Sequence, residues 1–138
     1  MPEKVSVLVI DDDSAHAEAA SESLGRSGYD CTVATSGTEG VRRLEKDDYD
    51  VVLTDLVMRD LSGIEIVRKV KSSRPETEVI VMTGYPSYET ALEAMDEGAY
   101  DYLNKPIDLN ILRAKIRKAE KPRRPRKSCT RPPRIRMP

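Results

Sequence analysis

Four apolar segments of this sequence each lead into a residue type that can bind a cation or a phosphoryl group. The first leads into Asp11 and Asp12, the next into Asp55, and the later two into Thr83 and Lys105. If the segments are parallel strands, their carboxyl ends lie along one edge of a sheet, where ligands bind in such folds. Carboxylates, a hydroxyl and an ammonium gathered there would suit a divalent cation and a phosphoryl group.

The three carboxylates predict a magnesium site. Asp11, Asp12 and Asp55 would repel one another when close, and a cation relieves that repulsion. Magnesium prefers hard oxygen ligands, commonly with one or two carboxylates from the protein. Asp55 could then act as a nucleophile, because a carboxylate that attacks phosphorus gives an acyl phosphate. Lys105 would add a second positive charge, and Thr83 would donate a hydrogen bond to a phosphoryl oxygen.

Residues beside these positions have structural interpretations. The Lys105–Pro106 bond is a candidate cis peptide, because X-Pro bonds reach cis at low cost, and the bend would turn Lys105 inward. Asp13 is interpreted as a neighbour of the site or a helix N-cap rather than a ligand. His16 is the single histidine of the chain and is predicted to be solvated, not a metal ligand.

The elements that must position these residues follow from alternating strand-like and helical patterns. This alternation is typical of βαβ units and predicts an α/β fold with a doubly wound five-stranded parallel sheet and five helices, as in flavodoxin-like proteins. The strands are predicted near residues 4–10, 29–34, 50–55, 78–83 and 100–104, and the helices near 14–25, 36–46, 62–73, 87–97 and 108–120. The first, third and fourth strands are almost wholly apolar and should be central, whereas the second and fifth alternate and should be edges. These apolar and alternating patterns favour the strand order 2-1-3-4-5.

Local signals support the helix boundaries. Ser36 with Glu39, and Ser62 with Glu65, have the spacing of capping boxes, in which each side chain binds a free backbone N–H of the first turn. Gly98 occupies the position of a left-handed C-terminal cap after the fourth helix.

Charge divides the chain into two parts. The 138 residues suit one domain over residues 1–120, followed by a tail or linker over residues 121–138. The tail is rich in proline and arginine, with eight bases and no acid, and is predicted to be disordered because it has little apolar surface to bury. It has no aromatic residue and is too short for a helix-turn-helix, so sequence-specific nucleic-acid binding is not predicted.

The compartment is predicted from what the sequence lacks. No apolar run reaches the roughly 18 residues that span a bilayer, and the N-terminus does not have the layout of a signal peptide. A protein that is cytoplasmic and makes no membrane contact is expected. Cys31 and Cys129 are expected to be reduced thiols.

Residues 4–120 resemble the receiver domain of bacterial two-component response regulators. The motifs that carry the resemblance are Val9-Ile10-Asp11-Asp12, Leu53-Thr54-Asp55, Val81-Met82-Thr83-Gly84 and Asp101-Tyr102-Leu103-Asn104-Lys105-Pro106. Residues 90–102 are most similar to receivers that precede sigma-54-dependent, NtrC-type activator modules. One residue departs from the pattern: Arg59 lies where receivers often carry proline. Gly63 is retained, so the loop after Asp55 is expected to close.

The resemblance implies a role for each site residue. Asp55 would accept a phosphoryl group from a phosphohistidine on a sensor histidine kinase. Mg²⁺ would be held by Asp11, Asp12, Asp55 and the backbone carbonyl of Val57. Thr83 and Lys105 would bind the phosphoryl oxygens. Thr83 and Tyr102 would form the switch that remodels the surface of the fourth helix, fifth strand and fifth helix.

The resemblance also implies partners and limits on activity. The remodelled surface would control an output protein or a fused effector domain, with transcription regulation as the expected output, and could support a homodimer. The protein would not be an enzyme beyond its own phosphorylation and dephosphorylation.

Two other functions stay open at the level of sequence. A phosphohydrolase of the haloacid dehalogenase type also uses a strand-end Asp nucleophile, magnesium, a Thr and a Lys. Such enzymes carry a second acid two residues after the nucleophile, where this chain has Val57, and the missing general acid argues against turnover. The other alternative is a receiver-like module that binds partners without being phosphorylated.

Overall fold

A computed structural model describes residues 4–120 of the chain. Five strands alternate with five helices in this part, and every element end lies within two residues of its predicted place. The strands are β1 (Ser6–Ile10), β2 (Asp30–Ala34), β3 (Val51–Asp55), β4 (Glu78–Thr83) and β5 (Asp101–Asn104). The helices are α1 (Ser14–Arg26), α2 (Gly37–Lys46), α3 (Gly63–Ser73), α4 (Tyr88–Asp96) and α5 (Leu109–Ala119). The predicted α/β alternation is confirmed.

The strands form one parallel sheet in the order β2-β1-β3-β4-β5, which confirms the predicted order. Val7 of β1 pairs with Cys31 of β2 on one side and with Val51 of β3 on the other. The chain therefore reverses its direction of winding between β1 and β3. In a doubly wound sheet this reversal opens a crevice beyond the carboxyl ends of the strands.

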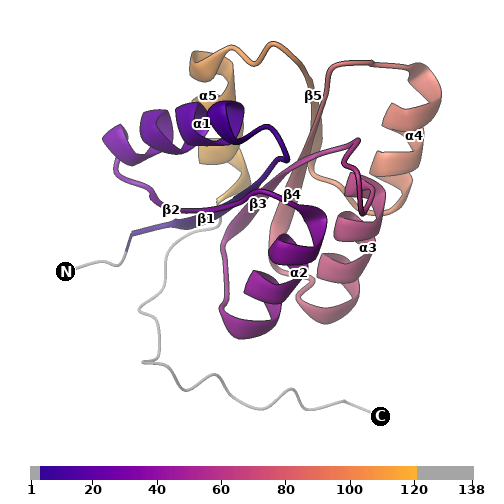
Figure 1. Ribbon diagram of the computed structural model, residues 1–138, viewed down its shortest axis with the longest axis horizontal. Coiled ribbons are helices and arrows are strands. Elements are labelled where there is room, and N and C mark those ends of the chain that lie inside the picture. The colour runs from indigo at the N-terminus through magenta and orange to yellow at the C-terminus, as the bar shows by residue number, and fades with distance from the viewer. Residues whose placement is uncertain (1–3, 121–138) are drawn as a thin grey trace.

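Helices cover both faces of the sheet. Figure 1 shows α1 and α5 together on one face, with α2, α3 and α4 on the other. Because strand side chains alternate between faces, Val7 and Val9 pack in the core beneath α1 and α5, whereas Leu8 and Ile10 pack in the core beneath α2 and α3. Both cores consist mainly of Val, Leu, Ile and Ala.

The burial of each strand follows its pattern of apolar and polar residues in the sequence. Every residue of β3 is buried, and so are all but the first residues of β1 and β4. Only the last residue of the edge strand β2 is buried. Strands that are covered on both faces need apolar side chains throughout. A continuous apolar run therefore predicted which strands are central.

The predicted helix caps are confirmed at three places and corrected at a fourth. Ser62 and Glu65 form the capping box of α3, Asp13 is the N-cap of α1, and Gly98 follows α4 with a φ of 110°. The box predicted at Ser36 is incomplete. Ser36 accepts a hydrogen bond from the Glu39 N–H, but the Glu39 carboxylate accepts its own bond from the Thr35 N–H at 2.9 Å, one residue earlier than predicted.

Two further predictions concern the basic tail and the membrane. The basic tail over residues 121–138, with Cys129, lies outside the described residues. Between residues 4 and 120, the structure has no helix that is long and apolar enough to cross a membrane.

Candidate functional site

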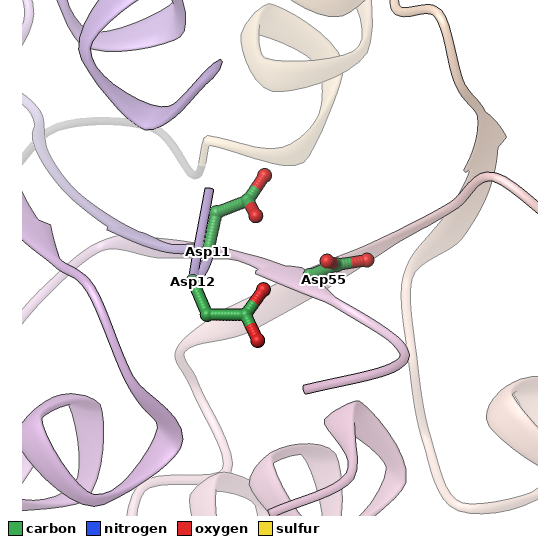
Figure 2. Close-up of side chains that lie close together, drawn as sticks. All are labelled: Asp11, Asp12 and Asp55. Atoms are coloured by element: carbon green, nitrogen blue, oxygen red, sulfur yellow. The ribbon is translucent and has the colours of Figure 1, made fainter. Parts of the chain in front are cut away.

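Three carboxylates meet at the carboxyl edge of the sheet. Asp11 and Asp12 directly follow β1, and Asp55 is the last residue of β3, so the pairing of these two strands brings them together (Figure 2). One carboxylate oxygen from each residue lies within 4.8 Å of the others. Asp11 is fully buried and Asp55 is 7% exposed. Three acids at this spacing, two of them shielded from water, repel one another strongly.

Lys105, which directly follows the edge strand β5, completes this cluster. Its Nζ lies 3.0 Å from Asp11 Oδ2 and 3.2 Å from Asp55 Oδ2. The side chain reaches the acids from the end of β5, and the Lys105–Pro106 peptide bond that follows is cis, as predicted. Burial alone would lower the pKa of Lys105, but its hydrogen bonds and charge interactions with Asp11 and Asp55 raise it, so the ammonium is firmly protonated.

The two acids that share Lys105 differ in their electrostatics. Burial raises the pKa of Asp11, but hydrogen bonds from the Asp13 N–H, His16 and Lys105 outweigh burial, and the net pKa is lowered. Burial also raises the pKa of Asp55, Lys105 lowers it, and the neighbouring charge of Asp11 raises it again, so the net pKa is raised. Of these two acids, Asp55 is therefore the one whose charge the surroundings compensate less.

His16 belongs to the site, which corrects the prediction that it is solvated. Its Nδ1 lies 2.8 Å from Asp11 Oδ2, and the side chain is 28% exposed. The contact arises because Asp13 caps α1, so the first turn of this helix places His16 over the end of β1. α1 starts three residues after Asp11, and its third residue, His16, therefore comes back beside that acid. This spacing was the available signal in the sequence.

Asp12 faces the loop between β3 and α3. The backbone N–H of Arg59 donates a hydrogen bond to Asp12 Oδ2 at 3.2 Å. The base of the loop is closed by Gly63, whose N–H donates to the Leu56 carbonyl at 2.7 Å. A Cβ on Gly63 would lie 2.5 Å from the Asp55 carbonyl oxygen, so only glycine allows this approach. The expectation that the loop closes is confirmed. Val57, the predicted carbonyl ligand, lies in the same loop with an exposed side chain.

Thr83 ends the next strand along the same edge. It is fully buried, and it directly follows Met82, the register partner of Asp55. Its hydroxyl accepts a hydrogen bond from the Tyr85 N–H at 3.0 Å, and its carbonyl accepts one from the Lys105 N–H at 2.7 Å. Thr83 is thus one step from Asp55 across the sheet and is bonded to Lys105 through the backbone.

Tyr102 lies in β5, two strands from Asp55. Its ring is partly buried against the core beneath α2, α3 and α4. Its hydroxyl lies 2.8 Å from Thr90 Oγ1 and accepts a hydrogen bond from the Ser87 N–H at 3.4 Å. These contacts tie Tyr102 to the start of α4, the helix that follows Thr83.

The cluster has the donors for one magnesium ion. Asp11, Asp12 and Asp55 supply hard carboxylate oxygens, the ligands that magnesium prefers. The net pKa of Asp55 is raised in part by the charge of Asp11, which is the mark of a site short of positive charge. The residues therefore fit a small divalent cation next to a carboxylate nucleophile, with an ammonium on the other side.

Comparison with known proteins identifies the family. Residues 7–117 match the model of the response regulator receiver domain. Over 117 residues, 85% of this chain, the sequence is 37% identical to transcriptional regulatory protein ZraR of Escherichia coli. It is 38% identical over 124 residues, 88% of this chain, to the DNA-binding transcriptional regulator NtrC of Rhizobium meliloti. The chain spans only 26% of the length of either relative.

A solved structure agrees in fold as well as in sequence. The beryllofluoride-activated NtrC4 receiver domain dimer superposes with a TM-score of 0.79 at 30% identity, over 83% of this chain and 95% of that one. The predicted similarity to NtrC-type receivers is thereby confirmed. This chain belongs to the response regulator receiver domain family of two-component systems.

Proposed function

We propose that Asp55 is the phosphoacceptor of this receiver and that a sensor histidine kinase is its phosphodonor. The observation that carries the proposal is the position of the Asp55 carboxylate. It lies 3.2 Å from the Lys105 ammonium, and its oxygen is grouped with those of Asp11 and Asp12. A nucleophile placed between a cation site and a fixed ammonium meets both the charge and the geometry that phosphoryl transfer needs.

The proposed reaction is a direct transfer to the carboxylate. An Asp55 oxygen attacks the phosphorus of the phosphohistidine, a new O–P bond forms, and the P–N bond breaks. The electron pair of the broken bond leaves with the imidazole of the kinase, which takes up a proton. The product is an acyl phosphate on Asp55, and attack by water at phosphorus later returns the carboxylate and inorganic phosphate. The receiver modifies only itself.

Magnesium would be held by the carboxylates of Asp11, Asp12 and Asp55 and by the Val57 backbone carbonyl. When bound, it neutralises charge on the phosphoryl oxygens in the transition state. Lys105 would keep its charge throughout, because its pKa is raised by Asp11 and Asp55. It would move from the carboxylates to a phosphoryl oxygen, and the Thr83 hydroxyl would donate to another.

The proposed output is a change in the surface made by α4, β5 and α5. Thr83 would turn toward the phosphoryl group, and Tyr102 would leave its contact with Thr90 and swing inward. A shift of this equilibrium from 1:99 to 99:1 requires about 5.5 kcal/mol of differential stabilisation. Charge-assisted hydrogen bonds to a half-buried phosphoryl group, together with the cation, suit that demand.

The partners of this surface are an output protein or a fused effector domain, and a second copy of the chain. Side chains of Tyr88, Leu92 and Met95 are exposed along α4, which leaves an apolar stripe on this helix. A dimer is in keeping with the NtrC4 receiver domain dimer, and a transcriptional output with the regulators ZraR and NtrC. We further propose that residues 1–120 form the receiver unit, that residues 121–138 are a linker, and that the protein acts in the cytoplasm.

Intact-mass spectrometry after incubation with a small-molecule phosphodonor tests the proposal. With magnesium, the wild type should gain one phosphoryl group, and it should gain none in the presence of a chelator. Asp55→Asn should gain none under either condition. An adduct that persists in Asp55→Asn would refute the assignment of the acceptor.

The haloacid dehalogenase alternative is separated by a turnover assay. Val57 occupies the position of the second acid of those enzymes and carries no acidic group. The wild type should therefore give no steady hydrolysis of a generic phosphate ester in magnesium buffer, and sustained multiple turnover that disappears in Asp55→Asn would favour the phosphohydrolase.

A further inference from the structure

The loop between β3 and α3 is fastened to the start of α2 by one carboxylate, that of Asp60. Its Oδ1 accepts hydrogen bonds from the N–H groups of Gly37 at 3.0 Å and Leu61 at 2.9 Å. Its Oδ2 accepts from the Thr38 N–H at 2.8 Å and the Thr38 hydroxyl at 2.6 Å. These bonds, with that of the Thr38 hydroxyl first, hold the pKa of Asp60 well below its ordinary value. Asp60 is therefore ionised and anchored.

The loop needs such an anchor because its sequence does not fix its shape. Residues 56–62 contain neither proline nor glycine. No proline ring therefore fixes a backbone angle in this loop, and no glycine allows a backbone conformation that other residues avoid. Contacts with the rest of the protein must then hold the loop in place. Gly63 closes its base against Leu56, and Asp60 fastens its tip to α2.

The start of α2 is fitted to receive the loop. A Cβ on Gly37 would lie 2.6 Å from the Leu61 Cβ and 3.1 Å from Asp60 Oδ1, so the glycine gives the loop room to approach. The free N–H groups in the first turn of a helix also favour a carboxylate. The room left by Gly37 and the hydrogen bonds from the first turn thus both place the Asp60 carboxylate at the start of α2.

The segment that Asp60 anchors reaches the metal ligands directly. Arg59 is the preceding residue, and its N–H donates to Asp12 Oδ2 at 3.2 Å. Val57, whose carbonyl is the proposed fourth ligand, lies in the same short loop. A loop that moved at Asp60 would therefore shift the hydrogen bond to Asp12 and the Val57 carbonyl together.

We infer that Asp60 is a positioning residue of the magnesium site, which acts by clamping the β3–α3 loop to α2. The inference rests on the proposed function of the acidic cluster and adds to it a residue that does not touch the metal. Loss of the clamp should weaken magnesium binding, because part of the binding free energy would then be spent on ordering the loop.

Magnesium titration by calorimetry on the full chain, at a temperature where circular dichroism shows every variant folded, tests this inference. Removal of an outer-shell partner typically weakens metal binding by 10- to 100-fold, and we expect about tenfold for Asp60→Ala. Thr38→Val removes only the 2.6 Å hydroxyl bond and leaves the charge of the protein unchanged, so about twofold to threefold is expected.

Thr38→Val separates the clamp from simple electrostatics, because Asp60→Ala also removes one negative charge near a cation site. It also decides the matter if Asp60→Ala fails to fold. Asp50→Ala is the matched control. Asp50 Oδ2 accepts from the Ser6 N–H at 2.8 Å at the opposite edge of the sheet, so its loss should lower stability and leave magnesium affinity within about twofold.

Each result has a distinct meaning. Weaker binding in both Asp60→Ala and Thr38→Val, with Asp50→Ala unchanged, supports the clamp. Wild-type affinity in Thr38→Val, or equal losses in all three variants, overturns it while the proposed function stands. A wild type that gives no magnesium-binding signal overturns the proposed function and the clamp together.

Discussion

At the scale of single residues, Asp55 and Asp11 share the ammonium of Lys105, yet their pKa values move in opposite directions. Asp11 has an additional donor in the Asp13 N–H and a contact with His16, whereas Asp55 has Lys105 and the opposing charge of Asp11. The folded state therefore favours the charged form of Asp11 and disfavours that of Asp55. A carboxylate in the position of Asp55 is stabilised by a divalent cation, which supplies the missing positive charge.

Asp55→Asn should stabilise the magnesium-free protein near pH 7. The folded-state pKa of Asp55 is raised above its ordinary value of 3.8. Protonation of Asp55 therefore stabilises the folded state. This stabilisation is fully present below pH 3.8 and is lost as the pH rises through the folded-state pKa. The amide carries no charge and avoids this loss. We expect a rise in Tm of about 2–4 °C by differential scanning calorimetry.

The same measurement at lower pH provides the control. The gap between Asp55→Asn and wild type should narrow as the pH falls through the folded-state pKa, and it should close below 3.8, where the wild-type carboxyl is protonated in both states. A variant that melts below the wild type at pH 7 without magnesium would show that the Lys105 ion pair outweighs burial and the Asp11 charge.

Sequence reasoning found the acids and Lys105 because each follows an apolar strand, and the ends of parallel strands share an edge. It missed His16, whose contact with Asp11 depends on where α1 starts and how its first turn is oriented. Asp60 lies in a loop without regular structure, and its partners are 22 and 23 residues away. No periodic pattern links such residues, so only coordinates bring them together.

At the scale of elements, the β3–α3 loop and the start of α3 depend on glycine at position 63. Gly63→Ala places a Cβ 2.5 Å from the Asp55 carbonyl oxygen and 2.8 Å from the Leu56 Cα. Backbone atoms must move to make room, and we expect a loss of about 2–3 kcal/mol in the free energy of unfolding. Urea denaturation followed by circular dichroism measures this loss.

Gly25→Ala is the matched control for that substitution. Gly25 lies in α1, and an added Cβ would meet no heavy atom within 4 Å apart from its chain neighbours and the backbone of its own helix. Alanine is the better helix former, so this variant should gain about 0.5–1 kcal/mol. Equal stabilities for the two variants would show that the close approach at Gly63 is not a constraint in solution.

Element boundaries were predictable because they are encoded locally. Strand burial follows the run of apolar residues, and the Ser62–Glu65 box and Gly98 give direct start and stop signals. The Ser36 box was misplaced because the Glu39 side chain can reach either of two neighbouring N–H groups, and it binds that of Thr35. The spacing in the sequence is the same for both outcomes.

At the scale of the whole molecule, the repulsion among Asp11, Asp12 and Asp55 exists only in the folded protein. Magnesium should therefore bind the folded state and stabilise the entire domain. At a free concentration one hundred times its dissociation constant, the expected gain is about 2.7 kcal/mol. Thermal melts across a magnesium series, with a monovalent salt at matched ionic strength, measure this gain.

Asp12→Ala should abolish that dependence on magnesium. The variant loses one of the three grouped carboxylates, and in buffer with a chelator it should remain folded because mutual repulsion is relieved. If its Tm still rises with magnesium as in the wild type, Asp12 is not a ligand.

The central claim is that the carboxylates, Lys105 and Thr83 serve one purpose, the transfer of a phosphoryl group to Asp55. Its most direct test is to treat the protein with a phosphodonor and magnesium, reduce any acyl phosphate with borohydride, and map the reduced residue by peptide mass spectrometry. The expected result is reduction at Asp55 alone, which disappears when magnesium is withheld. Reduction at Asp11 or Asp12, or none in a magnesium-loaded protein, would contradict the claim.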